Sequence, residues 1–249
     1  QESRGLGDVY KRQPLVKPNH PEFSSGPCAK RPQWSSEILK DSTLGRSHRS
    51  KVAKDKLQKV IKLTKSILKI PNNYLVGIVP GSDTGAIEMA MWNLLGPRPI
   101  DILVWDSFGS DWAKDIKSQL KLENVEISKS DYGLLPNLNK KDFVGDIVFN
   151  WNGTTAGVCV PNADWINNSR DGLTICDATS AAFAMKIDWL KLDVITFSWQ
   201  KCLGGEAGHG MLILSPKAIQ RINTYNPPWP IPKLFQLKKN DKLNNEIFS

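Results

Sequence analysis

The sequence predicts an α/β fold, a three-layer α-β-α arrangement around a mostly parallel central sheet. Beyond residue 71, short and continuous apolar runs alternate with stretches in which apolar residues recur at helical spacing. Continuous hydrophobicity is typical of strands that are buried on both faces of a parallel sheet. The 249 residues are 40% hydrophobic and 23% charged, so collagen-like, mucin-like and wholly disordered classes are excluded.

The N-terminal 50 residues precede this pattern. Residues 1–13 are polar and without periodicity, and we expect a disordered tail that is foreign to the fold. Residues 14–50 are expected to form an extended arm, because prolines that recur over 14–36 prevent a long helix there. A first helix is predicted at about 51–69, where apolar residues recur every three or four positions and lysines cover the other face.

The alternating pattern then predicts one domain over residues 51–224. Its strands are predicted at 75–79, 102–105, 125–128, 147–150, 173–176, 194–198 and 211–214, and its further helices at about 84–95, 110–120 and 216–224. Residues 225–249 are rich in Pro, Lys and Asn, and we expect a truncated linker toward a further domain. In folds of this kind, functional groups gather at the carboxyl ends of the strands.

The net charge of +8 is confined to one end of the chain. Residues 1–70 hold 16 Lys/Arg against 6 Asp/Glu, a net +10, whereas residues 71–249 have a net charge of −2. A basic nucleic-acid-binding module in the first 70 residues is an alternative of another class, and the lack of interleaved aromatic residues argues against it. We expect neither a nucleic-acid partner nor a membrane span, because no run reaches about 18 apolar residues. The four cysteines form no CxxC motif, so we expect no metal and a reducing cytoplasm.

Three segments carry residues suited to chemistry. The turn PGSDTG over 80–85 lies between a strand and a helix, where Ser82, Asp83 and Thr84 could face an anion at the positive end of the helix. A simple capping turn is an equal alternative. Asp177 follows a buried strand and could fix a cationic nitrogen, although taken alone it is more simply a cap. Lys201 also follows a buried strand, and desolvation there favours the neutral amine that attacks carbonyls, although such lysines are more often at the surface.

Taken together, these segments supply what pyridoxal phosphate requires. Lys201 provides the amine for a Schiff base, Asp177 the carboxylate for the ring nitrogen, and the turn an anion site for the phosphate. Trp112 is the natural candidate to stack on the ring.

With these residues in place, the chain resembles the phosphoserine aminotransferases of the alphaproteobacterial type, within the fold-type I pyridoxal-phosphate enzymes. The resemblance runs from about residue 17 to the end. It is carried by FSSGPCAKRP (23–32), LGRSHR (44–49), GIVPGSDTGAIEMAMW (77–92), WNGTTAGVCVPN (151–162), ICDATSAAFA (175–184) and TFSWQKCLGGEAGHGMLILSP (196–216). It implies the large domain of the aspartate aminotransferase fold, a homodimer, and a C-terminal small domain that is missing here.

The resemblance also implies residue roles. Lys201 and Asp177 would be the catalytic residues, with Lys201 moving the proton as general acid and base. Trp112 would stack on the ring, Thr154 would bond near its phenolic oxygen, and Gln200 with two of Ser82, Asp83 and Thr84 would hold the phosphate. His48 and Arg49 would grip the substrate's phosphate or the distal carboxylate of glutamate.

The implied activity is phosphoserine transamination. An amino group passes from L-glutamate to 3-phosphohydroxypyruvate, giving O-phospho-L-serine and 2-oxoglutarate in L-serine biosynthesis. Another fold-type I activity, such as serine or alanine–glyoxylate transamination, is the alternative. Because the family continues beyond Ser249, we expect an N-terminal fragment that is inactive or weakly active alone.

Overall fold

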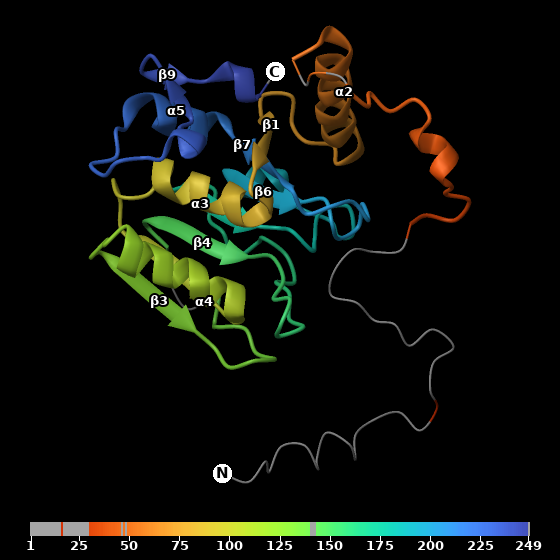
Figure 1. Ribbon diagram of the computed structural model, residues 1–249. Coiled ribbons are helices and arrows are strands. Elements are labelled where there is room, and N and C mark those ends of the chain that lie inside the picture. The colour runs from red at the N-terminus through yellow and green to blue at the C-terminus, as the bar shows by residue number, and fades with distance from the viewer. Residues whose placement is uncertain (1–15, 17–29, 46, 48, 140–142, 249) are drawn as a thin grey trace, which may run out of the picture.

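A seven-stranded sheet forms the centre of the protein in the computed structural model, which describes residues 16, 30–45, 47, 49–139 and 143–248 (Figure 1). The strands are β1 Leu75–Pro80, β2 Ile100–Val104, β3 Val125–Lys129, β4 Asp146–Asn150, β5 Thr174–Asp177, β6 Val194–Ser198 and β7 His209–Leu214. Each lies where the sequence predicts a strand. The α/β class and the mostly parallel sheet are therefore confirmed.

The strand order explains where functional groups can meet. The order is β1-β7-β6-β5-β4-β2-β3. Strands β6, β5, β4, β2 and β3 pair in parallel, whereas β7 is antiparallel to both of its neighbours. The carboxyl ends of β1, β2, β4, β5 and β6 consequently share one edge of the sheet with the amino end of β7.

The helices lie where their apolar spacing predicts them, with one shifted start. They are α2 Lys51–Ile67, α3 Ser82–Leu94, α4 Ser107–Lys114 and α5 Pro216–Thr224. The helix predicted over 110–120 begins at Ser107, because the Asp106 side chain accepts a hydrogen bond from Gly109 N (2.9 Å) and caps it. From Asp115 to Gln119 the helix continues with π geometry.

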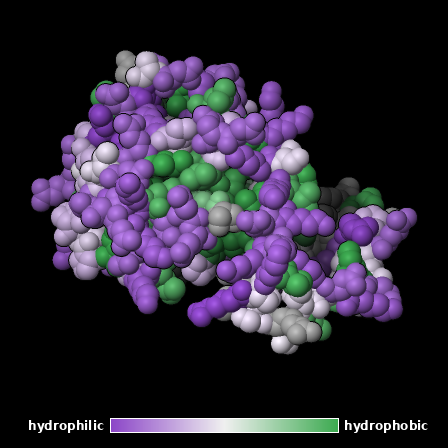
Figure 2. All heavy atoms as spheres, turned by 90° about the horizontal axis from the view of Figure 1, so that it is seen from above, coloured by the Kyte–Doolittle hydropathy of each residue, from purple (hydrophilic) through white to green (hydrophobic). Residues whose placement is uncertain are grey.

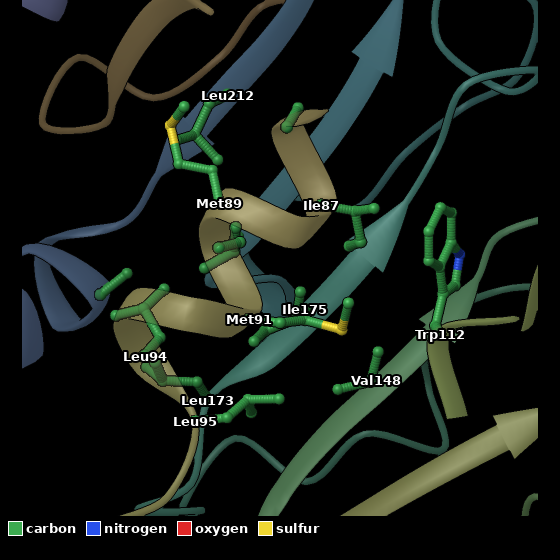
Figure 3. Close-up of a cluster of buried hydrophobic side chains, with 14 of the residues drawn as sticks. Ile87, Met89, Met91, Leu94, Leu95, Trp112, Val148, Leu173, Ile175 and Leu212 are labelled. Carbon is green, nitrogen blue, oxygen red and sulfur yellow. The ribbon is translucent and has the colours of Figure 1, made fainter. Parts of the chain in front are cut away.

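Helices α3, α4 and α5 contribute to the core on one face of the sheet. Figure 3 shows the centre of this core, in which Ile87 and Met91 of α3 lie with Ile175 of β5, Val148 of β4 and Trp112 of α4. All five side chains are at most 4% exposed. This layer fixes how α3 and α4 begin at the carboxyl edge of the sheet.

The opposite face is covered by α2 and by irregular chain. Its core contains Trp105, Phe149 and Phe197, and Ile61 and Leu68 pack against it from the region of α2. Among the residues of α2, only Thr64 is buried, and Val52, Leu63 and Ile67 are largely exposed. On this face the third layer of the fold is therefore built mainly from loops and the short helix η3 Trp189–Lys191.

The segment after α5, interpreted above as a linker, packs on the helical face. It contains the short helices η4 Lys233–Phe235 and η5 Asn245–Ile247 and the two-stranded hairpin of β8 Lys238–Lys239 and β9 Lys242–Leu243; η1 Ser36–Leu39 lies in the N-terminal arm. Leu237, Leu243 and Phe248 are buried in the core. Figure 2 views the molecule from above, where apolar side chains are visible in a recess that hydrophilic residues border. None of the helices in the described residues is long and apolar enough to span a membrane.

Candidate active site

The register of three central strands aligns polar side chains at the carboxyl edge. Asn150 of β4 pairs with Asp177 of β5, and Asp177 pairs with Thr196 of β6. Each lies two residues beyond an apolar residue of the helical-face core, as Asp177 does beyond Ile175. Because alternate residues of a strand point to the same face, all three side chains point toward the α3 side of the sheet.

A cavity opens beside this row of side chains. Its empty volume is about 460 Å³, part of which is open solvent. Eleven residues at or after the carboxyl ends of five strands line it: Ser82, Asp83, Thr84, Phe108, Trp112, Thr154, Asp177, Thr179, Ser180, Gln200 and Lys201. The fold thus brings together all eight of the cofactor residues predicted from the sequence.

Asp177 is held in the floor of the cavity. The side chain is 8% exposed. Its Oδ1 accepts a hydrogen bond from Thr179 N (3.0 Å), and its Oδ2 accepts one from Asn150 Nδ2 (3.3 Å). Both donors stabilise an ionised carboxylate. The sequence pattern does not reveal Asn150, because an Asn at the end of a strand has no motif of its own.

Asp83 lies next to Asp177 rather than in the mouth of the cavity. It is 6% exposed. Burial first, and then the charge of Asp177, raise the pKa of Asp83 well above its usual range. The hydroxyl groups of Thr179 and Thr196 face the same carboxyl group.

The amino terminus of α3 forms another wall. Gly81, with φ of 83°, and Ser82, with φ of 61°, both adopt left-handed backbone conformations where the helix begins. A non-glycine residue in this region costs about 1–2 kcal/mol, and such strain is typical of functional sites. No side chain caps α3, so its first backbone N–H groups are available to an anion. Gly210 of β7 permits the close approach, because a Cβ there would lie 2.2 Å from Ser82 O.

Asp106 was not predicted from the sequence, yet it joins two walls of the cavity. Besides capping α4, which carries Trp112, it accepts a hydrogen bond from Thr154 N at 3.0 Å through its second oxygen. It is 4% exposed, and burial raises its pKa. An Asp directly after a strand and three residues before Gly109 is a capping signal that could have found it.

The loop with Lys201 follows β6. Gly204 N donates to Lys201 O (2.9 Å), and Gly205 N donates to Trp199 O (2.9 Å). The Trp199 ring stacks on His209, with centroids 5.0 Å apart and an interplanar angle of 24°. Lys201 itself is half-buried at the cavity. The amine and the Asp177 carboxylate therefore border the same space.

Neither of the two substrate residues predicted from the sequence is placed at the cavity. His48 is outside the described residues. Arg49 is exposed, its N–H donates to Ser47 Oγ (3.1 Å), and it does not line the cavity.

Several polar atoms around the cavity have no hydrogen-bond partner although they are buried. They are Asp83 Oδ1, Trp112 Nε1, Asn150 Oδ1, Thr179 Oγ1, Thr196 Oγ1, Ser198 Oγ and Gln200 Oε1. Buried polar groups are normally paired, so a concentration of unpaired ones beside a cavity indicates a site for a polar ligand. In the described part of the chain, no cluster of His, Cys, Asp and Glu is suited to a metal. An aromatic, anionic ligand fits this lining of indole, hydroxyl, amine and helix terminus.

Known proteins with similar sequences are phosphoserine aminotransferases. The chain is 61% identical over 235 residues to the phosphoserine aminotransferase of Methanosarcina barkeri and 60% identical over 235 residues to that of Methanosarcina mazei. The chain is similar to phosphoserine aminotransferases. Each match covers 94% of this chain but 64% of the relative's length. These phosphoserine aminotransferases are Methanosarcina proteins, so the alphaproteobacterial type stays an expectation. No family model matches the chain.

Solved structures show the fold. An aspartate aminotransferase of subgroup IV from Thermus thermophilus superposes with a TM-score of 0.70 at 22% identity, covering 85% of this chain and 60% of the other. A pyridoxal-phosphate-bound phosphoserine aminotransferase from Trichomonas vaginalis superposes with a TM-score of 0.64 at 19% identity, covering 86% and 61%. The fold is therefore that of the aspartate aminotransferase-like proteins.

Proposed function

We propose that this chain carries the cofactor site of a pyridoxal-phosphate-dependent phosphoserine aminotransferase. The whole protein would transfer an amino group from L-glutamate to 3-phosphohydroxypyruvate, giving O-phospho-L-serine and 2-oxoglutarate. The observation that carries this proposal is the convergence of Lys201 and Asp177 on one cavity with Trp112 and the α3 terminus. The similarity to the Methanosarcina enzymes supports it.

Pyridoxal phosphate, when bound, supplies a ring that withdraws electrons from the substrate's Cα. Lys201 Nζ would hold the cofactor covalently and, once displaced by substrate, would take the proton from that Cα as a general base. Asp177 would keep a cationic ring nitrogen protonated, because its negative charge is fixed by Asn150 and by Thr179 N. Trp112 would offer the face of its indole ring, and Thr154 its hydroxyl group.

The phosphate would lie at the α3 terminus. Ser82 and Thr84 both line the cavity there, and the positive end of the helix favours an anion. Gln200 is the third candidate, since its Oε1 is buried without a partner and its amide can be turned to donate. We do not assign the phosphate to Asp83, because its carboxyl group faces Asp177.

The proposal is tested by trapping the cofactor. Pyridoxal phosphate is added to the 249-residue protein, the mixture is reduced with borohydride, and peptides are mapped by mass spectrometry. We expect one adduct, at Lys201, and none at that position in K201A. The K186A variant is the matched control, because Lys186 is exposed and lies outside the cavity. Adducts spread over surface lysines with none at Lys201 would refute the proposal.

The substrate is tested separately, on the full-length protein. A phosphate-selective enzyme should lose most of its kcat/KM with hydroxypyruvate in place of 3-phosphohydroxypyruvate. Equal rates, or a preference for glyoxylate, would favour the serine or alanine–glyoxylate alternative. We further propose that His48 and Arg49 grip an anionic substrate group, and R49A should then raise the KM for the phosphorylated substrate more than it lowers kcat.

The remaining expectations on assembly are also proposals. We infer a homodimeric cytoplasmic enzyme with small-molecule substrates and no nucleic-acid or membrane partner. The net charge of −2 over residues 71–249 supports the part on nucleic acid. Sedimentation of the full-length protein at two concentrations checks the dimer, and a steep salt-dependent affinity for DNA would contradict the last point.

A further inference from the structure

Two buried carboxyl groups meet beneath the cavity. Asp83 lies one helical turn before Ile87, so the two share a face of α3. Asp177 lies two residues after Ile175, so those two share a face of the sheet. Ile87 and Ile175 belong to the same core layer between α3 and β5 (Figure 3). The pair of aspartates continues this layer to the carboxyl edge, where both side chains line the cavity.

Two carboxylates cannot both stay ionised in contact and away from water, because each raises the proton affinity of the other. Asp83 is 6% and Asp177 8% exposed. Accordingly, burial and the charge of Asp177 raise the pKa of Asp83 well above its usual range. The other ionisable groups near the pair are Asp106 and Cys176, which feel the charge of Asp177, and Lys201 across the cavity.

The hydrogen bonds decide which carboxyl group holds the proton. Asp177 accepts from Thr179 N and from Asn150 Nδ2. These donors favour its ionised form. Asp83 Oδ1 has no hydrogen-bond partner. The hydroxyl groups of Thr179 and Thr196 that face this carboxyl group oppose the rise in its pKa, but they contribute less than burial and the charge of Asp177. A proton shared by the pair therefore resides on Asp83.

We propose that Asp83 is a positioning residue that acts as a neutral acid, donating its proton to the Asp177 carboxylate and holding that carboxylate ionised toward the cavity. The pair then carries one negative charge. The neutral state of Asp83 matters for the turn over 80–85. Asp83 lies between Ser82 and Thr84, so an ionised side chain there would repel any anion at the α3 terminus. The protonation stands on the geometry of the pair, whereas its use in holding a cofactor rests on the proposed function.

The protonation is tested without cofactor. The 249-residue protein is labelled with ¹³C at the aspartate carboxyl carbons, and their chemical shifts are followed by NMR from pH 4 to 9. We expect one aspartate signal to remain that of a carboxylic acid at pH 7, and we expect D83N to remove that signal. In D177N the Asp83 signal should titrate at a lower pH than in the wild type. An Asp83 carboxyl group that is fully ionised at pH 6 would overturn the proposal.

The positioning role is tested with pyridoxal phosphate on the same protein. Asparagine keeps a donor toward Asp177 without a charge, so D83N should bind within about threefold of the wild type and show the same pH dependence of the visible band. D83A lacks the donor and should bind at least tenfold more weakly. The exposed Asp111 of α4 provides the matched control, D111N, which should match the wild type. Binding by D83N as weak as by D83A would contradict the role. A wild-type protein that binds no pyridoxal phosphate would instead refute the proposed function and leave the NMR result standing.

Discussion

Asp106 connects two walls of the cavity through two hydrogen bonds. We expect the D106A substitution to remove both hydrogen bonds and so to loosen both walls. The carboxylate accepts from Gly109 N at 2.9 Å and from Thr154 N at 3.0 Å. Hydrogen bonds to a charged group contribute about 1.5–3 kcal/mol each. Burial raises the pKa of Asp106, so the ionised group is held against a desolvation cost. We therefore take the lower bound and expect the free energy of unfolding to fall by about 3 kcal/mol.

The measurement is urea unfolding at pH 7 followed by tryptophan fluorescence. In D106N the remaining carbonyl oxygen can still accept from Gly109, but the new amide group faces the Thr154 N–H, so roughly half the loss is expected. D111A is the control on the same helix, and an exposed site should change stability by less than about 0.5 kcal/mol. Pyridoxal phosphate should bind D106A at least about tenfold more weakly, because small displacements in a site have large effects. A D106A protein as stable as D111A would refute this reasoning.

Three further predictions concern residues around the sheet. R221M removes the ion-pair partner of the wholly buried Asp146, whose Oδ2 lies 2.5 Å from Arg221 Nη1. It should lower the free energy of unfolding in urea by about 3–5 kcal/mol, and R221M/D146N should recover part of this loss. G210A should abolish borohydride trapping of pyridoxal phosphate, because its Cβ would lie 2.2 Å from Ser82 O; trapping at the wild-type level would contradict the tight approach. Burial and nearby acids raise the pKa of Tyr74 to about 12. The stability that the neutral Tyr74 contributes should therefore be present below pH 10 and lost as the pH rises toward 12. In thermal unfolding Y74F should lose less stability than the wild type over that range, and an equal loss would contradict this assignment.

The strands and helices were predictable because their signals are local. Every strand of the sheet except β3 coincides with a run of apolar residues, and burial of these runs is what the sheet requires. The edge strand β3, with the sequence VEISK, alternates apolar and polar residues and is largely exposed. The start of α4 was misplaced by three residues, since the prediction followed apolar spacing and not the cap at Asp106. The π geometry over Asp115–Gln119 has no signal in that spacing at all.

The site was predictable only in part. Lys201, Asp177 and the turn over 80–85 each have a local signature after a strand, and their coincidence suggested a common chemistry. Asn150 has no such signature, and the capping signal of Asp106 reveals only its local bond to Gly109. The roles of both residues at the cavity depend on partners 27 and 48 residues away in the chain. Such roles arise from strand order, which sets which chain ends become neighbours.

By itself, the sequence determined the fold class, the positions of the strands and the residue types available for catalysis, since these follow from hydrophobic patterning and side-chain chemistry. Only the tertiary structure decided that Asp83 faces Asp177 and not the mouth of the cavity. Three adjacent residues of a turn look equivalent in sequence. The helix that begins there turns by about 100° per residue, so Ser82 and Thr84 point away from the layer in which Asp83 is buried.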